Sequence, residues 1–562
     1  MKKIVKKFIA LFLAIICCVG IVACNDDEVQ TGDSDGKVIE IKGVIAGYDV
    51  QWLTAIVNEF NKVYKDEYEA VITLTDTSID AANEIKRPKY CTTDIFFEYN
   101  IFDSVLPLSY SILKKKDVSL IEDLTDVWNT PAIGMDKKPQ GANLIDRVDS
   151  QAIIESVRYH GNMQGFNGLY GIPWQGGGEG VYVNPTVLKE RGNFTLDDLL
   201  TTDDWLNVLS TLAPDPSNQN NLTDVNGFFP MAWSQNYTAG YFDNLFHILM
   251  AQYEGATSHS NFVALQPDTG TVKDNGYSVY EKRGIYESLS VIEKLLNRDW
   301  ASPSTTAQNH VQAEALVATG KSACMITGDY MYKELEKDYA DYMQNVISIK
   351  IPVISALGVK LNLCGAMHNV GDSCADCNAK LRAIVKAVDG EVDTDEQIAS
   401  AQGVSADKVK TIREARGYYV ANHGSVQAFI PSYSDAKVGA KLFLRFMFSD
   451  EMMKLYREYT YVDLPFKYTN EPKADEREFM QAMYEIKSRP NSRSIQCFIY
   501  SNLRAQIPTY PKQNTVVATF QGLSYSHQYG TPLYTAKGIY DDNIEYVKTK
   551  WTTYLQAAGY SD

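Results

Sequence analysis

The residues best suited to binding chemistry lie around a run of three glycines, Gly176–Gly178. Trp174 precedes this run, Glu179 follows it directly, and Tyr182 comes three residues later. Glycine lets the backbone approach another group closely and adopt a positive φ without strain. An aromatic face beside backbone amides and a carboxylate suits a polyhydroxylated, mostly uncharged ligand. The same pattern is also typical of a glycine-rich hairpin with an aromatic ring packed beneath it, so the residues alone leave both interpretations open.

A second group of side chains with possible chemistry is Cys364, His368, Cys374 and Cys377. Thiolates and imidazole nitrogens are zinc ligands, whereas in an exported protein the same cysteines can form a local disulfide or stay free. The chain has no second Cys-x-x-Cys pair, and His368 is too close to Cys364 for a familiar zinc-finger spacing. We therefore predict no metal and no cofactor, and we expect the cysteines to be structural and unnecessary for ligand binding. Zinc, a disulfide and free thiols all stay open as alternatives.

The sequence contains no strong indication of a catalytic centre. HExxH does not occur, the one match to GxSxG lies in the polar N-terminal stretch 32–36, and the seven histidines are scattered. Gly320-Lys321-Ser322 could end a phosphate-binding loop, but Ala315 occupies the position of the first glycine of that motif. These motifs therefore predict no enzyme activity. Because any two of the 70 acidic residues could form a glycosidase pair, an exported carbohydrate-active enzyme is the alternative.

The elements that would position a site begin with alternating strands and helices. Residues 38–45, 70–75 and 93–98 read as strands, and residues 50–65 carry the apolar stripe of an amphipathic helix. This order predicts an α/β fold with a doubly wound sheet, in which ligands bind at the carboxyl ends of the strands. The side chains that follow the first and third strands are Tyr48, Glu98 and Tyr99.

Residues 168–184, GLYGIPWQGGGEGVYVN, resemble the signature of the extracellular solute-binding proteins of bacterial ABC importers, a family that includes maltose-binding and other sugar-binding proteins. Leu188 and Gly192 also fit that signature, whereas Val183 stands where the family often has tyrosine. Three further stretches resemble the same family: the opening strands with residues 120–124, then 315–330 (ALVATGKSACMITGDY), then the helix 435–448.

This resemblance implies a two-lobed periplasmic-binding-protein-like fold of type II, in which each lobe is a sheet flanked by helices and a cleft separates the lobes. We expect residues 38–165 and 323–350 to form the first lobe. Residues 166–322 and 351–562 are expected to form the second lobe, with an insertion at 355–415.

The resemblance also implies ligand-binding residues on both sides of the cleft. Trp174 is expected to stack on the ligand, with Tyr48, Glu98, Trp233 and Asp329 converging on it; Tyr330 replaces the family's usual tryptophan. The full expected set is Tyr48, Glu98, Tyr99, Trp174, Glu179, Tyr182, Trp233, Asp329 and Tyr330.

The ligand implied by the family is a carbohydrate, and the chain's length and many aromatic residues favour an oligosaccharide. A monomer would deliver it to the membrane subunits of an ABC importer. A surface glycan-binding protein without a transporter is a further alternative.

The N-terminus indicates export and lipidation. Four lysines precede the apolar run 8–22, which is typical of a signal peptide spanning residues 1–23. Ile21-Val22-Ala23-Cys24 resembles a lipobox, so Cys24 is expected to carry the lipid that anchors the protein to the cell membrane on its extracytoplasmic side. Residues 24–37 are polar and acidic and are expected to form a flexible tether.

The charge of the chain argues against nucleic-acid binding. The formal net charge is −17, and removal of the four lysines of residues 1–23, a segment without acidic residues, brings it to −21. A surface of this sign repels phosphate backbones, and no stripe of lysine and arginine is present in the sequence.

Overall fold

The structure is a computed structural model that describes residues 36–560 with short gaps. The gaps are at 77, 100, 116–117, 149–150, 160–165, 214–226, 237–238, 370, 422–425, 469–477, 496, 498–501, 508, 512–514 and 522–533. The expected signal peptide, Cys24 and all but the last two residues of the expected tether lie outside the described residues.

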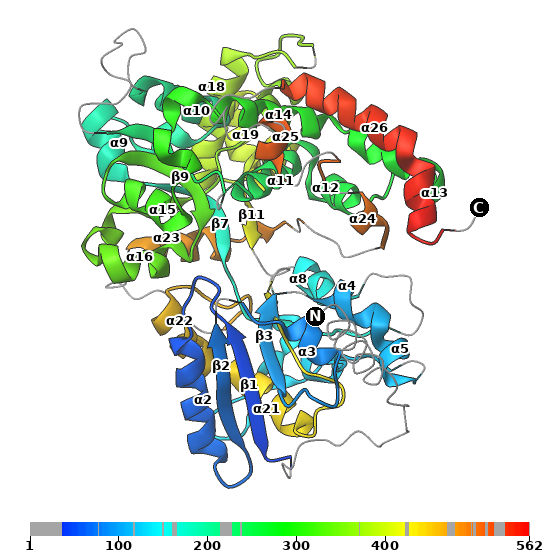
Figure 1. Ribbon diagram of the computed structural model, residues 1–562. Coiled ribbons are helices and arrows are strands. Elements are labelled where there is room, and N and C mark those ends of the chain that lie inside the picture. Colours follow the sequence, from blue (N-terminus) through cyan, green and yellow to red (C-terminus); the bar gives the residue numbers. More distant parts are fainter. Residues whose placement is uncertain are drawn as a thin grey trace, which may run out of the picture.

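Two mixed sheets, each flanked by helices, divide the molecule into two lobes, which Figure 1 shows one above the other. The first lobe contains a five-stranded sheet in the order β2 (Glu69–Asp76), β1 (Val38–Val44), β3 (Ile95–Tyr99), β12 (Val426–Phe429), β6 (Ile172–Pro173). Strand β1 pairs in parallel with β2 and β3, whereas β12 runs antiparallel to β3 and β6.

The apolar stripe of helix α2 (Gln51–Tyr64) explains how the first lobe folds. Trp52, Ile56 and Phe60 are fully buried, and Phe60 packs its ring against Phe443 and Phe446. Both partners come from α21 (Lys437–Met447), so this core joins segments far apart in sequence. The other elements of this lobe are α3 (Ala81–Ile85), α4 (Phe102–Val105), α5 (Ser109–Leu113), α6 (Thr125–Trp128), β4 (Pro131–Ile133), β5 (Pro139–Asn143), α7 (Leu144–Arg147), α8 (Gln151–Ser156) and α22 (Asp450–Thr460).

The second lobe contains a sheet in the order β13 (Arg493–Ser494), β11 (Tyr418–Ala421), β7 (Gly178–Val183), β9 (Ser322–Gly328), β8 (Phe229–Ala232). Strand β10 (Ile347–Ile349) pairs with β7 beside β11. Strand β7 is buried along its whole length, and so is β9, its antiparallel neighbour. A strand covered on both faces has no contact with water, so its side chains must be apolar or hydrogen-bonded. Any ionisable side chain on β7 is therefore shielded from solvent.

Helices cover both faces of the second sheet (Figure 1). Four of them, α17 to α20, come from the expected insertion at 355–415, and their apolar residues join the main core of this lobe. The helices are α9 (Pro185–Gly192), α10 (Thr202–Leu212), α11 (Tyr241–Glu254), α12 (Ala256–Val263), α13 (Val272–Asn275), α14 (Arg283–Leu295), α15 (His310–Ala318), α16 (Met331–Tyr339), α17 (Ala356–Lys360), α18 (Ala375–Asp389), α19 (Asp395–Gln402), α20 (Ala406–Arg416), α23 (Glu478–Ser488), α24 (Asn502–Gln506), α25 (Val516–Gln521) and α26 (Ala536–Ala557).

The structure confirms the predicted α/β fold with two lobes, but the chain crosses between the sheets at places other than those expected. The segment 323–350 was expected in the first lobe, yet β9 and β10 pair with β7 of the second sheet. Conversely, β6 and β12 belong to the first sheet, although 166–322 and 351–562 were expected in the second lobe. Apolar pattern predicts that a segment is a strand, but it does not predict its partner, because pairing is set by non-local contacts.

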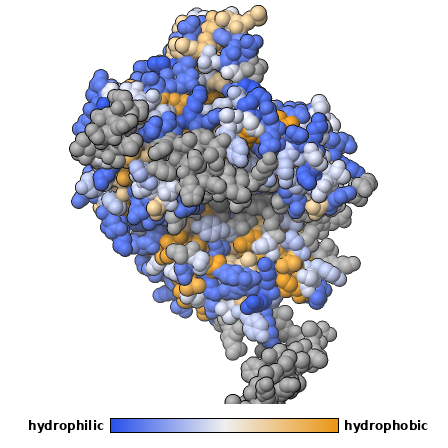
Figure 2. All heavy atoms as spheres, turned by 45° about the horizontal axis from the view of Figure 1, so that its top comes forward, coloured by the Kyte–Doolittle hydropathy of each residue, from blue (hydrophilic) through white to orange (hydrophobic). Residues whose placement is uncertain are grey.

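The surface is mostly hydrophilic on the face that Figure 2 shows, and its apolar side chains form separate small patches. Within the described part of the chain, every helix is too short or too polar to cross a membrane.

Candidate functional site

A buried hydrogen bond joins the two lobes. Tyr48, in the loop after β1, donates its hydroxyl to Oδ1 of Asp329, the residue directly after β9. The other carboxylate oxygen of Asp329 accepts a bond from the Gly178 amide at 2.7 Å and lies 3.4 Å from Nζ of Lys487. Asp329 is fully buried, and these three groups face its carboxyl oxygens. Burial and the charge of Asp329 raise the pKa of Tyr48 well above its usual value, which keeps the phenol protonated as a donor.

Aromatic rings surround this contact. Tyr330 packs edge-on against Tyr48, with ring centroids 6.1 Å apart, and it also contacts Tyr241 at 6.0 Å. A Cβ atom at Gly47 would lie 2.9 Å from Cβ of Tyr330, and Gly47 has a φ of +80°. Glycine at this position therefore allows both the turn after β1 and the close approach of a ring from the other lobe.

The three central glycines are needed for close approach within the protein itself. A Cβ atom at Gly176 would lie 1.8 Å from the Asp463 carbonyl oxygen, and one at Gly177 would lie 2.7 Å from the Tyr48 hydroxyl. At Gly178 it would lie 2.6 Å from the Met483 methyl group. The glycine run thus crosses between the lobes through a space already filled by other parts of the chain.

Trp174 is enclosed in the core of the first lobe. Its ring stacks on Trp52 with centroids 5.4 Å apart and meets Phe97 edge-on at 6.1 Å, and its side chain is 0% exposed. Its indole Nε1 has no hydrogen-bond partner among the described residues. The ring is therefore packed as a core residue in this arrangement, while its one polar atom is left without a bond.

Glu98 and Tyr99 lie at the carboxyl end of β3, as their position after a strand predicted. Glu98 accepts a bond from the Tyr99 amide at 2.7 Å, and its second oxygen is buried without a hydrogen-bond partner among the described residues. Burial raises the pKa of Glu98. Tyr99 is 47% exposed, and its pKa is raised by partial burial and then by the charges of Glu98 and Glu334. Glu334 belongs to α16 of the second lobe, so Tyr99 lies where the two lobes face each other.

Glu179 is a buried acid on β7. Its carboxyl oxygen Oε2 has no partner among the described residues, and burial together with the charges of Asp329 and Asp243 raises its pKa to about 8. Its charge in turn contributes to the raised pKa values of Tyr330 and Tyr241. The structure therefore brings Tyr48, Glu179, Asp329 and Tyr330 to one buried region between the sheets, with Tyr99 at its margin.

Tyr182 and Trp233 are placed elsewhere. Tyr182 is on the opposite face of β7 from Glu179, as expected for residues three apart on a strand, and its ring packs on Phe479. Its hydroxyl donates to the Gly178 carbonyl at 2.8 Å. Trp233 packs against Phe242 in the core of the second lobe. Among the described residues, neither ring packs on Tyr48, although burial and then the charge of Asp329 raise the pKa of Tyr182.

Sequence reasoning missed two residues at this contact. Lys487, on α23, donates to the Gly176 carbonyl at 2.5 Å and also faces Asp329. It lies in the region 470–562, where no motif marks it. Glu334 follows Tyr330 by one helical turn and lies 3.4 Å from His310. In the sequence, only its position four residues after Tyr330, on the same face of a helix, could have indicated that Glu334 lies here.

A cavity of about 460 Å³ lies beside this region, between the lobes. Ligand pockets commonly measure about 300–1,000 Å³, so a small molecule fits this volume. Three tyrosines and three cationic residues give it a mixed aromatic and polar lining. The lining residues are Gly176, Tyr419, Asp463–Tyr468, Tyr484, Lys487, Arg489, Pro490 and Ser492.

The lobes are expected to separate when the bond between them is removed. Tyr48→Phe keeps the ring but leaves Asp329 Oδ1 buried without its donor, at a cost of about 1–3 kcal/mol to the closed arrangement. Small-angle scattering should then give a larger radius of gyration than that of wild type. Tyr182→Phe is the control, because it removes a buried hydroxyl bonded within the second lobe. Equal radii for Tyr48→Phe and wild type would contradict the expectation.

Comparison with known proteins agrees with this architecture. Residues 111–454 match the family model of the bacterial extracellular solute-binding proteins. Since the match covers more than half of the sequence, the chain belongs to this family of binding proteins. No curated protein matches the chain in sequence.

Three solved structures illustrate the likeness in fold. A probable secreted solute-binding lipoprotein from Streptomyces coelicolor has a TM-score of 0.54 at 12% identity, covering 92% of this chain and 100% of its own. A chitin oligosaccharide binding protein has a TM-score of 0.52 at 14% identity, with coverages of 92% and 99%. An ABC transporter solute-binding protein from Thermotoga lettingae, bound to α-D-tagatose, has a TM-score of 0.52 at 11% identity, covering 93% of this chain and 100% of its own. At these identities the likeness concerns the fold.

Proposed function

We propose that this protein is a lipid-anchored extracytoplasmic receptor that binds a carbohydrate, of oligosaccharide size, between its lobes and delivers it to an ABC importer. The main support for this proposal is the buried region around Tyr48 and Asp329, where tyrosine rings and carboxyl groups from both lobes meet. Sugars offer hydroxyl groups to polar atoms and C–H faces to aromatic rings, so this mixture suits them.

Unpartnered polar atoms on both lobes support the same proposal. Three such atoms have no hydrogen-bond partner within the part of the chain that the structure describes: Oε2 of Glu98 and Nε1 of Trp174 in the first lobe, and Oε2 of Glu179 in the second. Leaving such atoms unpaired costs about 1–3 kcal/mol each, a cost that a ligand's hydroxyl groups would remove. With its pKa raised to about 8, Glu179 keeps its proton at neutral pH and can both donate and accept a hydrogen bond.

Sugar binding by two of the structural neighbours is consistent with this ligand class. The Thermotoga protein was solved with α-D-tagatose, and another neighbour is a chitin oligosaccharide binding protein. Closure of two lobes around a ligand and presentation of the closed form to the transporter would be the mechanism, without bond-making or bond-breaking.

A thermal-shift screen over mono- and oligosaccharides tests the ligand class. A ligand at 100 times its Kd stabilises the folded state by about 2.7 kcal/mol, so a true ligand should raise the melting temperature. Product analysis after long incubation separates the enzyme alternative, since a receptor returns the sugar unchanged. Uptake of the labelled sugar by cells, with and without the protein, separates a receptor that serves an importer from a surface glycan-binding protein. The absence of any stabilising sugar would contradict the proposal.

Tyr99→Ala is expected to weaken binding of the sugar found in that screen by about 1–3 kcal/mol, because Tyr99 offers an exposed ring at the opening between the lobes. Isothermal titration calorimetry measures the loss. Tyr342→Ala is a matched control, since Tyr342 is 46% exposed and follows α16 on the second lobe. An equal loss of affinity in both variants would argue against a specific role for Tyr99.

Cys24→Ala is expected to release the protein from the membrane fraction into the medium, because the thiol of Cys24 would be the acyl acceptor. Cell fractionation and the mobility of the mature protein measure the effect. Cys91→Ser should leave the protein membrane-bound. Retention of the Cys24→Ala protein in the membrane with unchanged mobility would contradict lipidation at this residue.

A further inference from the structure

Four side chains of metal-binding type meet in the segment between α17 and α18. The ligand atoms of Cys364, His368, Cys374 and Cys377 all lie within 4.8 Å of one another. The sulfur of Cys364 is 3.0 Å from Nε2 of His368 and 3.8 Å from the sulfur of Cys374. The sulfur of Cys377 is 3.5 Å from the same imidazole nitrogen.

These separations match the edges of a tetrahedron around zinc. With Zn–S bonds of about 2.3 Å and Zn–N bonds of about 2.0–2.1 Å, tetrahedral angles put two sulfurs about 3.8 Å apart and a sulfur and a nitrogen about 3.6 Å apart. The distance between Cys364 and Cys374 and that between Cys377 and His368 agree with these values. The distance between Cys364 and His368 is about half an ångström shorter and would lengthen on binding.

Local structure holds the four residues in place. Cys374 is the N-cap of α18, and its sulfur accepts a bond from the Cys377 amide at 3.3 Å. Cys377, in the first turn of α18, is fully buried in the core of the second lobe. A Cβ atom at Gly358 would lie 3.0 Å from the Cys377 carbonyl oxygen, which shows how closely α17 packs on α18. The chain after α17 then turns back and brings Cys364 and His368 to the same point.

The alternatives use fewer of these groups. A single disulfide among Cys364, Cys374 and Cys377 would leave one thiol and the imidazole without a role. Free thiols would give no reason for an imidazole nitrogen to lie within 3.5 Å of two of the sulfurs. Three sulfurs and one nitrogen within 4.8 Å of one another are a donor set typical of zinc.

We propose that Cys364, His368, Cys374 and Cys377 bind one zinc ion. Because the protein supplies all four ligands, no position is left for water or substrate, and the ion is structural. It would fix the segment 361–374 onto the start of α18 and so hold the expected insertion in one conformation. This replaces the sequence-based expectation that the protein has no metal site.

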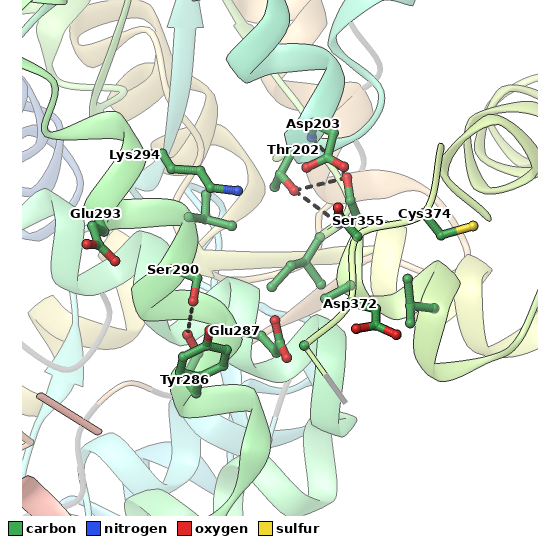
Figure 3. Close-up of a pocket in the computed structure, with 16 residues that line it drawn as sticks. Thr202, Asp203, Tyr286, Glu287, Ser290, Glu293, Lys294, Ser355, Asp372 and Cys374 are labelled. Carbon is green, nitrogen blue, oxygen red and sulfur yellow. Dashed lines mark hydrogen bonds between the residues drawn. The ribbon is translucent and has the colours of Figure 1, made fainter. Parts of the chain in front are cut away.

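The zinc-bound segment would also shape one wall of a neighbouring cavity. A cavity of about 220 Å³ is lined by residues 371–374 on one side and by α14 on the other. In Figure 3 Asp372 and Glu287 lie on this cavity, whereas the sulfur of Cys374 points away from it. The thiol therefore faces the proposed metal centre and not the cavity. The metal centre and the cavity lie on opposite sides of the same loop.

Elemental analysis of the full-length protein, purified without added metal, tests the proposal. We expect about one zinc ion per chain. The Cys374→Ser/Cys377→Ser double variant should lose at least nine-tenths of it. Cys91→Ser and Cys497→Ser remove free thiols outside the cluster and should retain the metal. Replacement by cobalt(II) should give the thiolate-to-cobalt absorption and the visible bands of a tetrahedral site.

A second measurement keeps the proposal testable if the double variant does not fold. Wild-type protein is alkylated in its native state with and without a chelator, and the labelled cysteines are mapped by mass spectrometry. Labelling of Cys364 and Cys374 should rise severalfold once zinc is removed, whereas labelling of Cys91 should not change. Absence of bound metal after reduction and zinc addition, or a mapped disulfide within the cluster, would overturn the proposal.

Discussion

Trp174→Ala is expected to lower the free energy of unfolding of the ligand-free protein by about 3–5 kcal/mol. The Trp174 ring fills space between Trp52 and Phe97, and no part of it reaches solvent. Removing it leaves a cavity in the core of the first lobe that its stiff aromatic neighbours cannot fill. Chemical denaturation of wild type and variant measures the loss. The sequence predicted instead that Trp174 stacks on the ligand in the cleft.

Two tryptophan-to-phenylalanine variants separate packing from hydrogen bonding at this position. Trp128 is fully buried in the same core, but its Nε1 donates to the Gly171 carbonyl at 2.9 Å. Trp128→Phe removes the donor to that carbonyl and should cost about 1–3 kcal/mol more than Trp174→Phe, since the Trp174 indole nitrogen bonds none of the described residues. If Trp174→Phe instead keeps stability but loses sugar affinity, the indole nitrogen donates to the ligand. A stability loss below about 1 kcal/mol for Trp174→Ala would contradict its role as a core residue and favour the stacking on a ligand that the sequence predicted.

The local elements of the first lobe could be predicted from the sequence because their patterns are strong. The helix expected at 50–65 is α2, and the strands expected at 38–45 and 93–98 are β1 and β3, each within two residues at either end. The pairing of β3 with β12, more than 300 residues away, could not be predicted in the same way. An apolar pattern shows that a strand is buried but not which strand lies beside it. The lobe boundaries depend on that pairing and could not be predicted from the pattern.

The candidate site was predictable by position but not by orientation. Residues after strands, such as Tyr48, Glu98 and Asp329, lie near the contact between the lobes because the carboxyl ends of strands gather there. Whether a side chain at a strand end points to the core or to the cleft depends on its neighbours, and for Trp174 a second tryptophan on α2 decides it. Lys487 comes from a part of the chain without a motif, so only the folded structure brings it to Asp329.

Raising the pH from about 5 to about 8 is expected to destabilise the ligand-free protein, with Glu179 as a main cause. Burial raises the pKa of this carboxyl to about 8, whereas in the unfolded chain the usual value is about 4.3. Between these values the folded protein holds a proton that the unfolded chain has released. Stability is therefore full below the unfolded pKa and falls as the pH rises, by up to about 1.4 kcal/mol per pH unit for this group. Denaturation at a series of pH values measures the slope.

Glu179→Gln isolates the contribution of this one carboxyl. The amide keeps the size of the side chain but cannot ionise, so the slope between about pH 5 and 8 should become shallower by up to about 1.4 kcal/mol per pH unit. Part of the slope should persist, because burial also raises the pKa of Asp243 on α11 to about 8. Adding Asp243→Asn should remove that part as well. Glu190→Gln, the same change at an exposed position on α9, is the control. A slope as steep in Glu179→Gln as in wild type would show that Glu179 is already ionised in the folded protein, and its role as a hydrogen-bond donor to a sugar would then be wrong.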